Sequence, residues 1–177
     1  TARDYTPLVH DAERHTLTLE FALHGSGPAA EWALNAPIGQ WLGLAGPRGS
    51  MVVNPQLDWH VLMGDDSALP AISRRLAELP ADTRAIVRVQ LAKPADQREL
   101  PSAAQVDLQW VPSLLAAADA LSLPAGDGFI WAAGEHHAMA ELRPRLLGKP
   151  GADAKRMRIA AYWKQGEIAH HAELDVA

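Results

Sequence analysis

The sequence predicts two unlike halves, an incomplete antiparallel barrel over residues 1–54 and an open α/β domain over residues 55–177. Two observations lead to this fold class. In the first half, apolar and polar residues alternate and short turns separate the segments, as in antiparallel strands. In the second half, apolar segments of strand length alternate with helical patterns, which predicts a parallel sheet with right-handed crossovers.

Three elements are expected in the first half. The segment His15–Leu23 alternates strictly and predicts a half-buried strand. A short helix is predicted over Pro28–Leu34, because a proline lacks only an N–H that the first helical turn does not need. Gln40–Ala45 is predicted as another strand, ending at the turn Gly46–Gly49.

The second half is expected to build one layered domain. Its predicted elements are strand Trp59–Met63, a helix ending at Leu79, strand Ala85–Leu91, strand Val106–Val111, helix Ser113–Leu121, strand Phe129–Ala133, helix Glu135–Leu147 and strand Met157–Trp163. Parallel sheets of this kind bind ligands beyond the carboxyl ends of their strands. We therefore expect a ligand site at that edge, facing the first half.

Composition excludes several classes of function. The chain has no cysteine, which excludes disulfides, thiolate zinc sites and cysteine-ligated iron–sulfur clusters, and which fits a reducing, cytoplasmic compartment. The net charge is −5 without a basic block, so no nucleic-acid partner is expected. No window approaches the roughly 20 apolar residues of a membrane span, and no signal peptide leads the chain, so no membrane insertion is expected.

Two motifs in the first half suit a ligand. Arg3-Asp4-Tyr5-Thr6 places an aromatic ring beside a cation and a hydroxyl, which suits a planar ligand with a polar edge; a purely structural role is the alternative. In His24–Ala33, two glycines precede a proline at a helix start. Free backbone N–H groups would converge there and suit a pyrophosphate, although an ordinary strand–helix turn has the same composition.

Two further motifs lie at the predicted carboxyl edge. Gly64–Ile72 starts a helix with Ser67 in its first turn; it lacks GxGxxG and phosphate-loop signatures, and helix capping is the alternative. The turn Ala133-Gly134-Glu135 is small enough for a flat ring to approach its backbone, or is a plain turn. His137 and Glu141 share a helix face, but HExxH is absent and no third ligand is in view, so no metal site and no catalytic acid or base is assigned.

The order and spacing of these motifs resemble the siderophore-interacting protein family, a branch of the ferredoxin-reductase-like flavoenzymes. The matching series is Arg3-x-Tyr5-Thr6, His24-Gly25, Gly27-Pro28-Ala29-Ala30-x-Trp32-Ala33, Gly46-Pro47-Arg48-Gly49, Gly64-Asp65-x-x-Ala68-Leu69-Pro70-Ala71-Ile72, Ala133-Gly134-Glu135 and Tyr162-Trp163-x-x-Gly166. The family carries several dozen residues ahead of Arg3 that supply the first barrel strands. We expect the barrel to be incomplete without them.

The resemblance implies an FAD-binding barrel, an NAD(P)H-binding α/β domain and a set of cofactor-binding residues. That set is Arg3, Tyr5 and Thr6 for the isoalloxazine and adjoining phosphate, His24, Gly25, Gly27, Pro28, Ala29, Ala30 and Trp32 for the rest of FAD, Asp65, Ser67 and Ala68 facing the cleft, Gly134 and Glu135 for the nicotinamide nucleotide, and Trp163 near the flavin.

The implied activity is NAD(P)H-dependent, FAD-mediated reduction of Fe(III)–siderophore complexes, releasing Fe(II). Arg48 and Lys164 are the expected substrate contacts. NADPH is expected over NADH, because Lys93 and Arg98 follow the second strand of the α/β domain and Arg74 and Arg75 lie on the preceding helix. A general flavin or ferredoxin reductase and a non-catalytic siderophore-binding module are the alternatives.

Overall fold

The structure is a computed structural model that describes residues 2–23, 27–46, 52–166 and 172–173. Its strands are β1 (Pro7–Asp11), β2 (Thr16–Leu19), β3 (Trp59–Asp65), β4 (Arg84–Gln90), β5 (Gln105–Trp110), β6 (Gly128–Glu135), β7 (Met157–Trp163) and β8 (Ala172–Glu173). Its α-helices are α1 (Pro28–Asn35), α2 (Leu69–Glu78), α3 (Leu114–Ala120) and α4 (His136–Leu147), with short 3-10 turns η1 (Asp66–Ala68), η2 (Pro94–Asp96) and η3 (Ala154–Arg156).

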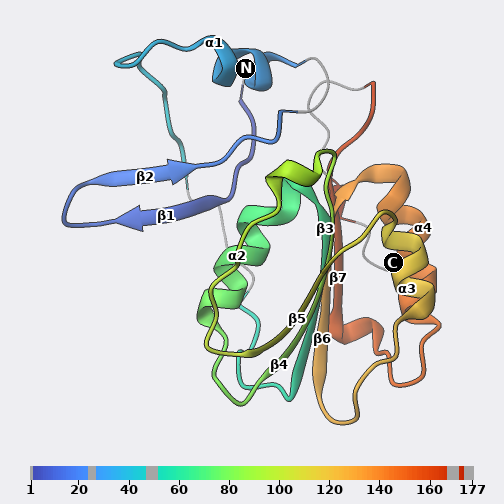
Figure 1. The fold of residues 1–177 in the computed structure, drawn as a ribbon. Helices are drawn as coiled ribbons and strands as arrows, with labels where there is room; N and C mark the ends of the chain where they lie inside the picture. Colours follow the sequence, from blue (N-terminus) through green and yellow to red (C-terminus); the bar gives the residue numbers. More distant parts are fainter. Residues whose placement is uncertain (1, 24–26, 47–51, 167–171, 174–177) are drawn as a thin grey trace.

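The strands form two sheets. The large sheet has the order β5-β4-β3-β6-β7-β8, in which β3 to β7 run parallel and β8 pairs antiparallel to β7. The small sheet is the antiparallel pair β1-β2. In Figure 1 the small sheet lies beside α2, and α1 lies beyond the carboxyl ends of the large sheet. The expected combination of antiparallel and parallel parts is confirmed, whereas β8 was not expected.

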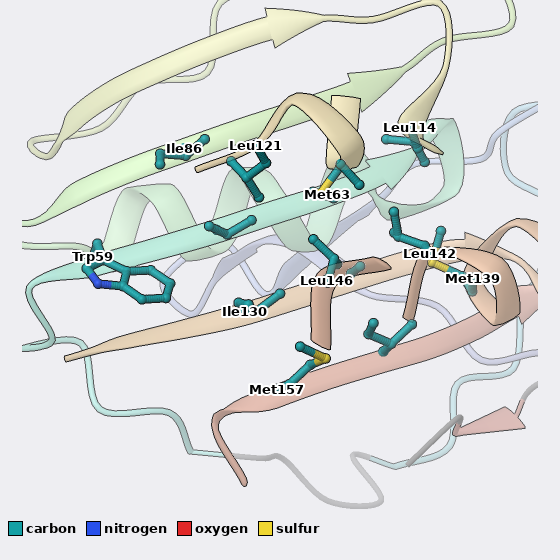
Figure 2. Packing of buried hydrophobic residues seen from close by; sticks show 14 residues of the cluster. Trp59, Met63, Ile86, Leu114, Leu121, Ile130, Met139, Leu142, Leu146 and Met157 are labelled. Carbon is teal, nitrogen blue, oxygen red and sulfur yellow. The ribbon is translucent and has the colours of Figure 1, made fainter. Parts of the chain in front are cut away.

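Helices cover both faces of the large sheet, with α2 on one face and α3 and α4 on the other (Figure 1). Two buried clusters result, one under each layer. Figure 2 shows the cluster under α3 and α4, where Leu114, Leu142 and Leu146 point toward Met63 and Ile130 of the central strands. Among the residues described, no helix is both long and apolar enough to cross a bilayer.

The first predicted strand is shorter than expected. In place of His15–Leu23, the ladder contains only Thr16–Leu19, paired with a strand over Pro7–Asp11 that was not predicted. The turn between them is held by the Asp11 carboxylate, whose Oδ1 accepts from the backbone N–H of Glu13 and Arg14 at 3.0 Å and 2.9 Å. The turn fixes the register of the pair, and residues 20–23 lie outside it because β1 begins at Pro7, the partner of Leu19.

The predicted strand Gln40–Ala45 is wrong. Residues 41–46 have no regular secondary structure, and the Trp41 side chain is 95% exposed. A strand is stable only when a neighbour satisfies its backbone groups, and none of the described strands lies beside this segment. The sequence pattern of Gln40–Ala45 therefore predicted a strand for which the described residues offer no pairing partner.

In the second half, every predicted element is present, with ends moved by at most a few residues. The strand expected to end at Met63 continues through Gly64 and Asp65, because Gly64 still pairs with Val89 and Ala133. The last predicted strand has the bounds found for β7. These are central strands of a parallel sheet, buried by helices on both faces, which makes their apolar runs easy to recognise.

One buried side chain in β3 is titratable. His60 is 0% exposed and lies on the α2 side of the sheet, and neither ring nitrogen has a hydrogen-bond partner among the described residues. Burial is the main cause that lowers the pKa of His60 from 6.5 to about 4, and the nearby charge of Arg75 adds to it. The Pro55 carbonyl has a weaker effect in the opposite direction, but it falls short of hydrogen-bonding geometry. His60 is therefore neutral at neutral pH.

Candidate functional site

Three adjacent strands of the large sheet end side by side. β3 ends at Asp65, β6 at Glu135 and β7 at Trp163. Gly64 pairs with Ala133, and Glu135 pairs with Trp163. Asp65, Glu135 and Trp163, three of the predicted site residues, thus meet at the carboxyl edge of the sheet. Asp65 and Trp163 are 98 positions apart in the sequence.

The Asp65 carboxylate joins these strand ends. Its Oδ1 accepts from the backbone N–H of Ser67 at 2.9 Å and from the Ser67 hydroxyl at 2.5 Å. Its Oδ2 accepts from the backbone N–H of Glu135 and from the indole Nε1–H of Trp163, each at 2.9 Å. A carboxylate has about four acceptor positions, so these four donors account for its capacity.

Two glycines make this arrangement possible. A Cβ on Gly134 would lie 2.6 Å from Asp65 Oδ2, so the carboxylate occupies the space where a side chain would be. A Cβ on Gly64 would lie 2.4 Å from the Cβ of Ala68 and 2.6 Å from a backbone carbonyl oxygen. The Ala68 side chain is 0% exposed and packs in the core under α2, which leaves only its backbone for the expected role at the cleft.

Glu135 caps α4. Its Oε2 accepts from the backbone N–H of His137 and Ala138 at 2.7 Å and 3.1 Å, and its Oε1 accepts from the N–H of Gln165 at 3.4 Å. Partial burial acts to raise the pKa of Glu135, but the N–H donors of Ala138, Gln165 and His137 outweigh it and lower the pKa overall. The ionised carboxylate thus ties the end of β6 to the segment after β7.

In the first half, aromatic rings gather beside an unpaired cationic donor. The rings of Tyr5 and Phe21 are 4.5 Å apart between centroids, and Phe21 and Trp32 are 5.7 Å apart. Arg3 donates through Nη1 to the carbonyl of Ala2 at 2.6 Å, whereas its buried Nη2 has no partner among the described residues. A buried guanidinium donor of this kind fits an anionic group such as a phosphate.

Thr6 connects this aromatic group to the strand ends. Its side chain lies close enough to the hydroxyl of Tyr162, the residue before Trp163 in β7, to lower the pKa of that hydroxyl. Burial raises the pKa of Tyr162, and the nearby Thr6 side chain only partly offsets this rise. The segment that begins with Arg3 is therefore held next to the carboxyl edge of the large sheet, so two groups of predicted site residues lie together.

The predicted pyrophosphate turn is described only in part. Gly27 is the N-cap of α1 and Pro28 its first residue, followed by Ala29 and Ala30, and no side chain caps the helix start. His24 and Gly25, like Arg48 among the expected substrate contacts, lie outside the described residues. Lys164 directly follows β7 and is partly buried.

Three of the four cations expected to favour NADPH have partners in the first half of the chain. Arg98 forms a two-bond ion pair with Glu20, at 2.5 Å and 2.7 Å. Arg74 donates to the carbonyl of Pro7 and Arg75 to that of Val53, both at 3.2 Å. These guanidinium groups hold the two halves together, which leaves Lys93 as the remaining cation of the four for a 2′-phosphate.

Other features of the described residues lie away from this edge. A hollow of about 270 Å³ opens at the amino ends of the strands, lined by residues such as Trp59, Asp127 and Arg156, and shares no residue with the strand-end site. Within the described ranges, no three His, Asp or Glu side chains are grouped closely enough to hold a metal ion.

Sequence reasoning missed two residues of the site. Phe21 was placed on a strand face, and nothing in that pattern shows that it would contact both Tyr5 and Trp32. Tyr162 was part of a quoted motif without a role of its own. Its contact with Thr6 spans most of the chain, so only the tertiary structure reveals it.

Comparisons with known proteins agree along the chain. Residues 1–51 match the family model described as the siderophore-interacting FAD-binding domain, and residues 57–166 match the model described as siderophore-interacting protein. An NADPH-dependent ferric-chelate reductase of Escherichia coli (strain K12) is 36% identical over 169 residues, which cover 92% of this chain and 66% of that protein. The ferric vibriobactin reductase ViuB of Vibrio cholerae is 32% identical, over 98% of this chain and 69% of its own length.

Solved structures show the same likeness. A siderophore utilization protein from T. fusca superposes with a TM-score of 0.82 at 35% identity, covering 93% of this chain and 67% of that one. The siderophore-interacting protein SipS from Aeromonas hydrophila superposes with a TM-score of 0.81 at 27% identity, covering 93% and 68%. The chain thus spans about two thirds of the length of the relatives it matches.

Proposed function

Because this chain belongs to the siderophore-interacting protein family, we propose that it is the cofactor-binding part of an NADPH-dependent, FAD-containing reductase of ferric siderophores. The observation that carries the proposal is the junction between the halves. The Thr6 side chain lies beside the Tyr162 hydroxyl of β7, and the end of β7 is tied to β3 and β6 through Asp65. A flavin on the first half would there meet a nicotinamide on the second.

The chain's own residues supply binding and orientation. We assign Arg3, with its unpaired buried donor, to a phosphate of FAD, and Tyr5, which is 39% exposed, to stacking on the ring system. Gly27, Pro28, Ala29 and Ala30 of the α1 start are assigned to the remainder of the nucleotide. Bound FAD supplies the conversion between the electron pair of a hydride and the single electron that Fe(III) takes.

The nicotinamide nucleotide is assigned to the carboxyl edge of the large sheet. Gly134, Glu135 and Ser67 line that edge, and Trp163 stands beside them. Divided in this way, residues 1–54 form the FAD-binding unit and residues 55–177 the NADPH-binding unit. Dependence on NADPH fits a cytoplasmic location.

The ferric siderophore is assigned to the flavin side of the junction. Many ferric siderophores are anionic, and a chain of net charge −5 attracts them only where cations gather locally. Lys164, next to Trp163, and Arg48 are the cations proposed for this contact. Changing Lys164 to Glu is expected to raise KM for an anionic ferric chelate while FAD content stays unchanged.

Coenzyme choice is assigned to Lys93. It precedes η2, just beyond the end of β4, where a cation accommodates a 2′-phosphate. Lys93→Glu should lower kcat/KM for NADPH and leave that for NADH nearly unchanged. Lys155→Glu, at an exposed position of η3 on the opposite side of the domain, is the matched control. An unchanged ratio between the two coenzymes would remove Lys93 from the site.

One experiment separates the proposed function from its alternatives. Purified protein is incubated with FAD, freed of unbound flavin and mixed with NADPH, with and without a ferric siderophore, in the absence of oxygen. Without the chelate, NADPH oxidation should stop at about one equivalent per bound FAD; the reductase continues beyond that, and forms Fe(II), only when the chelate accepts the electrons. A general reductase would reduce ferredoxin or free flavin faster than the chelate. A binding module would retain the chelate without oxidising NADPH.

A further inference from the structure

We propose that Asp65 is a positioning residue that fixes the indole of Trp163 at the carboxyl edge before any cofactor binds, and not itself a cofactor ligand. The proposal deepens the proposed function and rests on it for the identity of the cofactors. It revises the expectation that Asp65 contacts the flavin or the nicotinamide directly.

The first argument is acceptor capacity. Asp65 accepts from two donors on Ser67, from the N–H of Glu135 and from the indole N–H of Trp163, all within 2.9 Å. With about four acceptor positions in use, a ribose hydroxyl or a carboxamide could bind Asp65 only by displacing one of these donors. The carboxylate therefore acts through its neighbours.

The second argument is the space around it. Gly134 leaves open the position in which a Cβ would lie 2.6 Å from Asp65 Oδ2. The oxygen that accepts from Trp163 and Glu135 sits in that space. Two separate features, the missing side chain on β6 and the carboxylate on β3, thus serve the same contact with β7.

The third argument is what Trp163 would do without this bond. An indole has a single donor, and this one is committed to a carboxylate oxygen, which is a stronger acceptor than a neutral carbonyl. Trp163 is the last residue of β7 and its side chain is only partly buried, so a flat ligand can reach it. Fixing the ring in advance lowers the ordering cost when a flat ligand binds beside it.

The test follows the indole N–H of Trp163 by NMR, with its signal assigned from Trp163→Phe. In wild-type protein without flavin or nucleotide, this N–H should already be protected from exchange with solvent. Asp65→Asn keeps the size but replaces an acceptor oxygen with an NH₂ group, and exchange should become about tenfold faster or more. An unprotected N–H in the wild type overturns the proposal, even if the Asn variant fails to fold.

Asp58→Asn is the matched control. Asp58 lies just before β3, and its Oδ2 accepts from the N–H of Asp127 at 2.7 Å, just before β6, so it joins the same two strands at their other ends. The charge change is the same in both variants. Exchange at Trp163 should be unaffected by Asp58→Asn; equal acceleration in both variants would mean general loosening of the sheet and would overturn the proposal.

A second readout uses FAD affinity in a double-mutant cycle. If Asp65 acts mainly through Trp163, Asp65→Asn should weaken FAD binding severalfold in wild type and far less in the Trp163→Phe background. Equal weakening in both backgrounds would identify Asp65 as a direct ligand. The two proposals fail separately. A wild-type protein that reduces the chelate but has an unprotected Trp163 indole N–H would contradict only this proposal. A wild-type protein with a protected indole N–H that does not reduce the chelate would contradict only the proposed function.

Discussion

His60 should make the protein's stability depend on pH between neutrality and mild acid. The unfolded chain binds a proton at His60 near the ordinary pKa of 6.5, whereas in the folded chain this pKa is about 4. As the pH falls through this window, the unfolded state takes up the proton and the folded state does not. The folded state therefore loses stability on acidification, and the loss is complete below the folded pKa.

The size of the effect follows from the two pKa values. Between about pH 7 and about pH 5, the free energy of unfolding should fall by about 2 kcal/mol through His60 alone. Arg75, the charged neighbour named with it, stays protonated over this range and so does not cancel the effect.

The assay is urea unfolding at both pH values, in wild type and in His60→Leu. Because neither ring nitrogen has a partner among the described residues, the leucine loses no hydrogen bond, and stability at neutral pH should change by less than about 1.5 kcal/mol. Subtracting the variant from the wild type removes the contribution of all other titrating groups. If both proteins lost the same stability on acidification, the reasoning about His60 would be refuted.

Three further predictions concern single contacts. Gly64→Ala should cost about 1–3 kcal/mol in chemical unfolding, because the new Cβ meets neighbours at 2.4 Å and 2.6 Å, whereas Gly43→Ala, with nothing within 4 Å, should cost little. A double-mutant cycle on Glu20 and Arg98 should give a coupling of only about 0.5–1 kcal/mol that shrinks in high salt, since both side chains are partly exposed; a larger, salt-independent value would contradict this. Tyr5→Ala should weaken FAD binding by about 1–3 kcal/mol in fluorescence titration, and unchanged binding would assign Tyr5 to packing against Phe21 alone.

The α/β half was predictable because its signals are local. Each central strand is a short apolar run closed by a turn, and β7 was predicted with the bounds that the structure has. Residues 1–54 were harder, because a strand such as the one expected at Gln40–Ala45 depends on a neighbour that the pattern does not reveal. The site divides in the same way: Asp65 and Trp163 were each identified from their motifs, but the bond between them joins residues 98 positions apart.

Two arginine contacts between the halves need a particular side chain on one side only. Arg74 and Arg75 of α2 donate to the backbone carbonyls of Pro7 and Val53, and a carbonyl is present whatever residue stands there. Among the contacts described between the halves, the Glu20–Arg98 pair and the Thr6–Tyr162 contact require particular side chains on both sides. Residues 7 and 53 can therefore vary among relatives without losing these bonds, and a chimaera whose first 54 residues come from a relative should keep both arginine contacts as long as its backbone follows the same path.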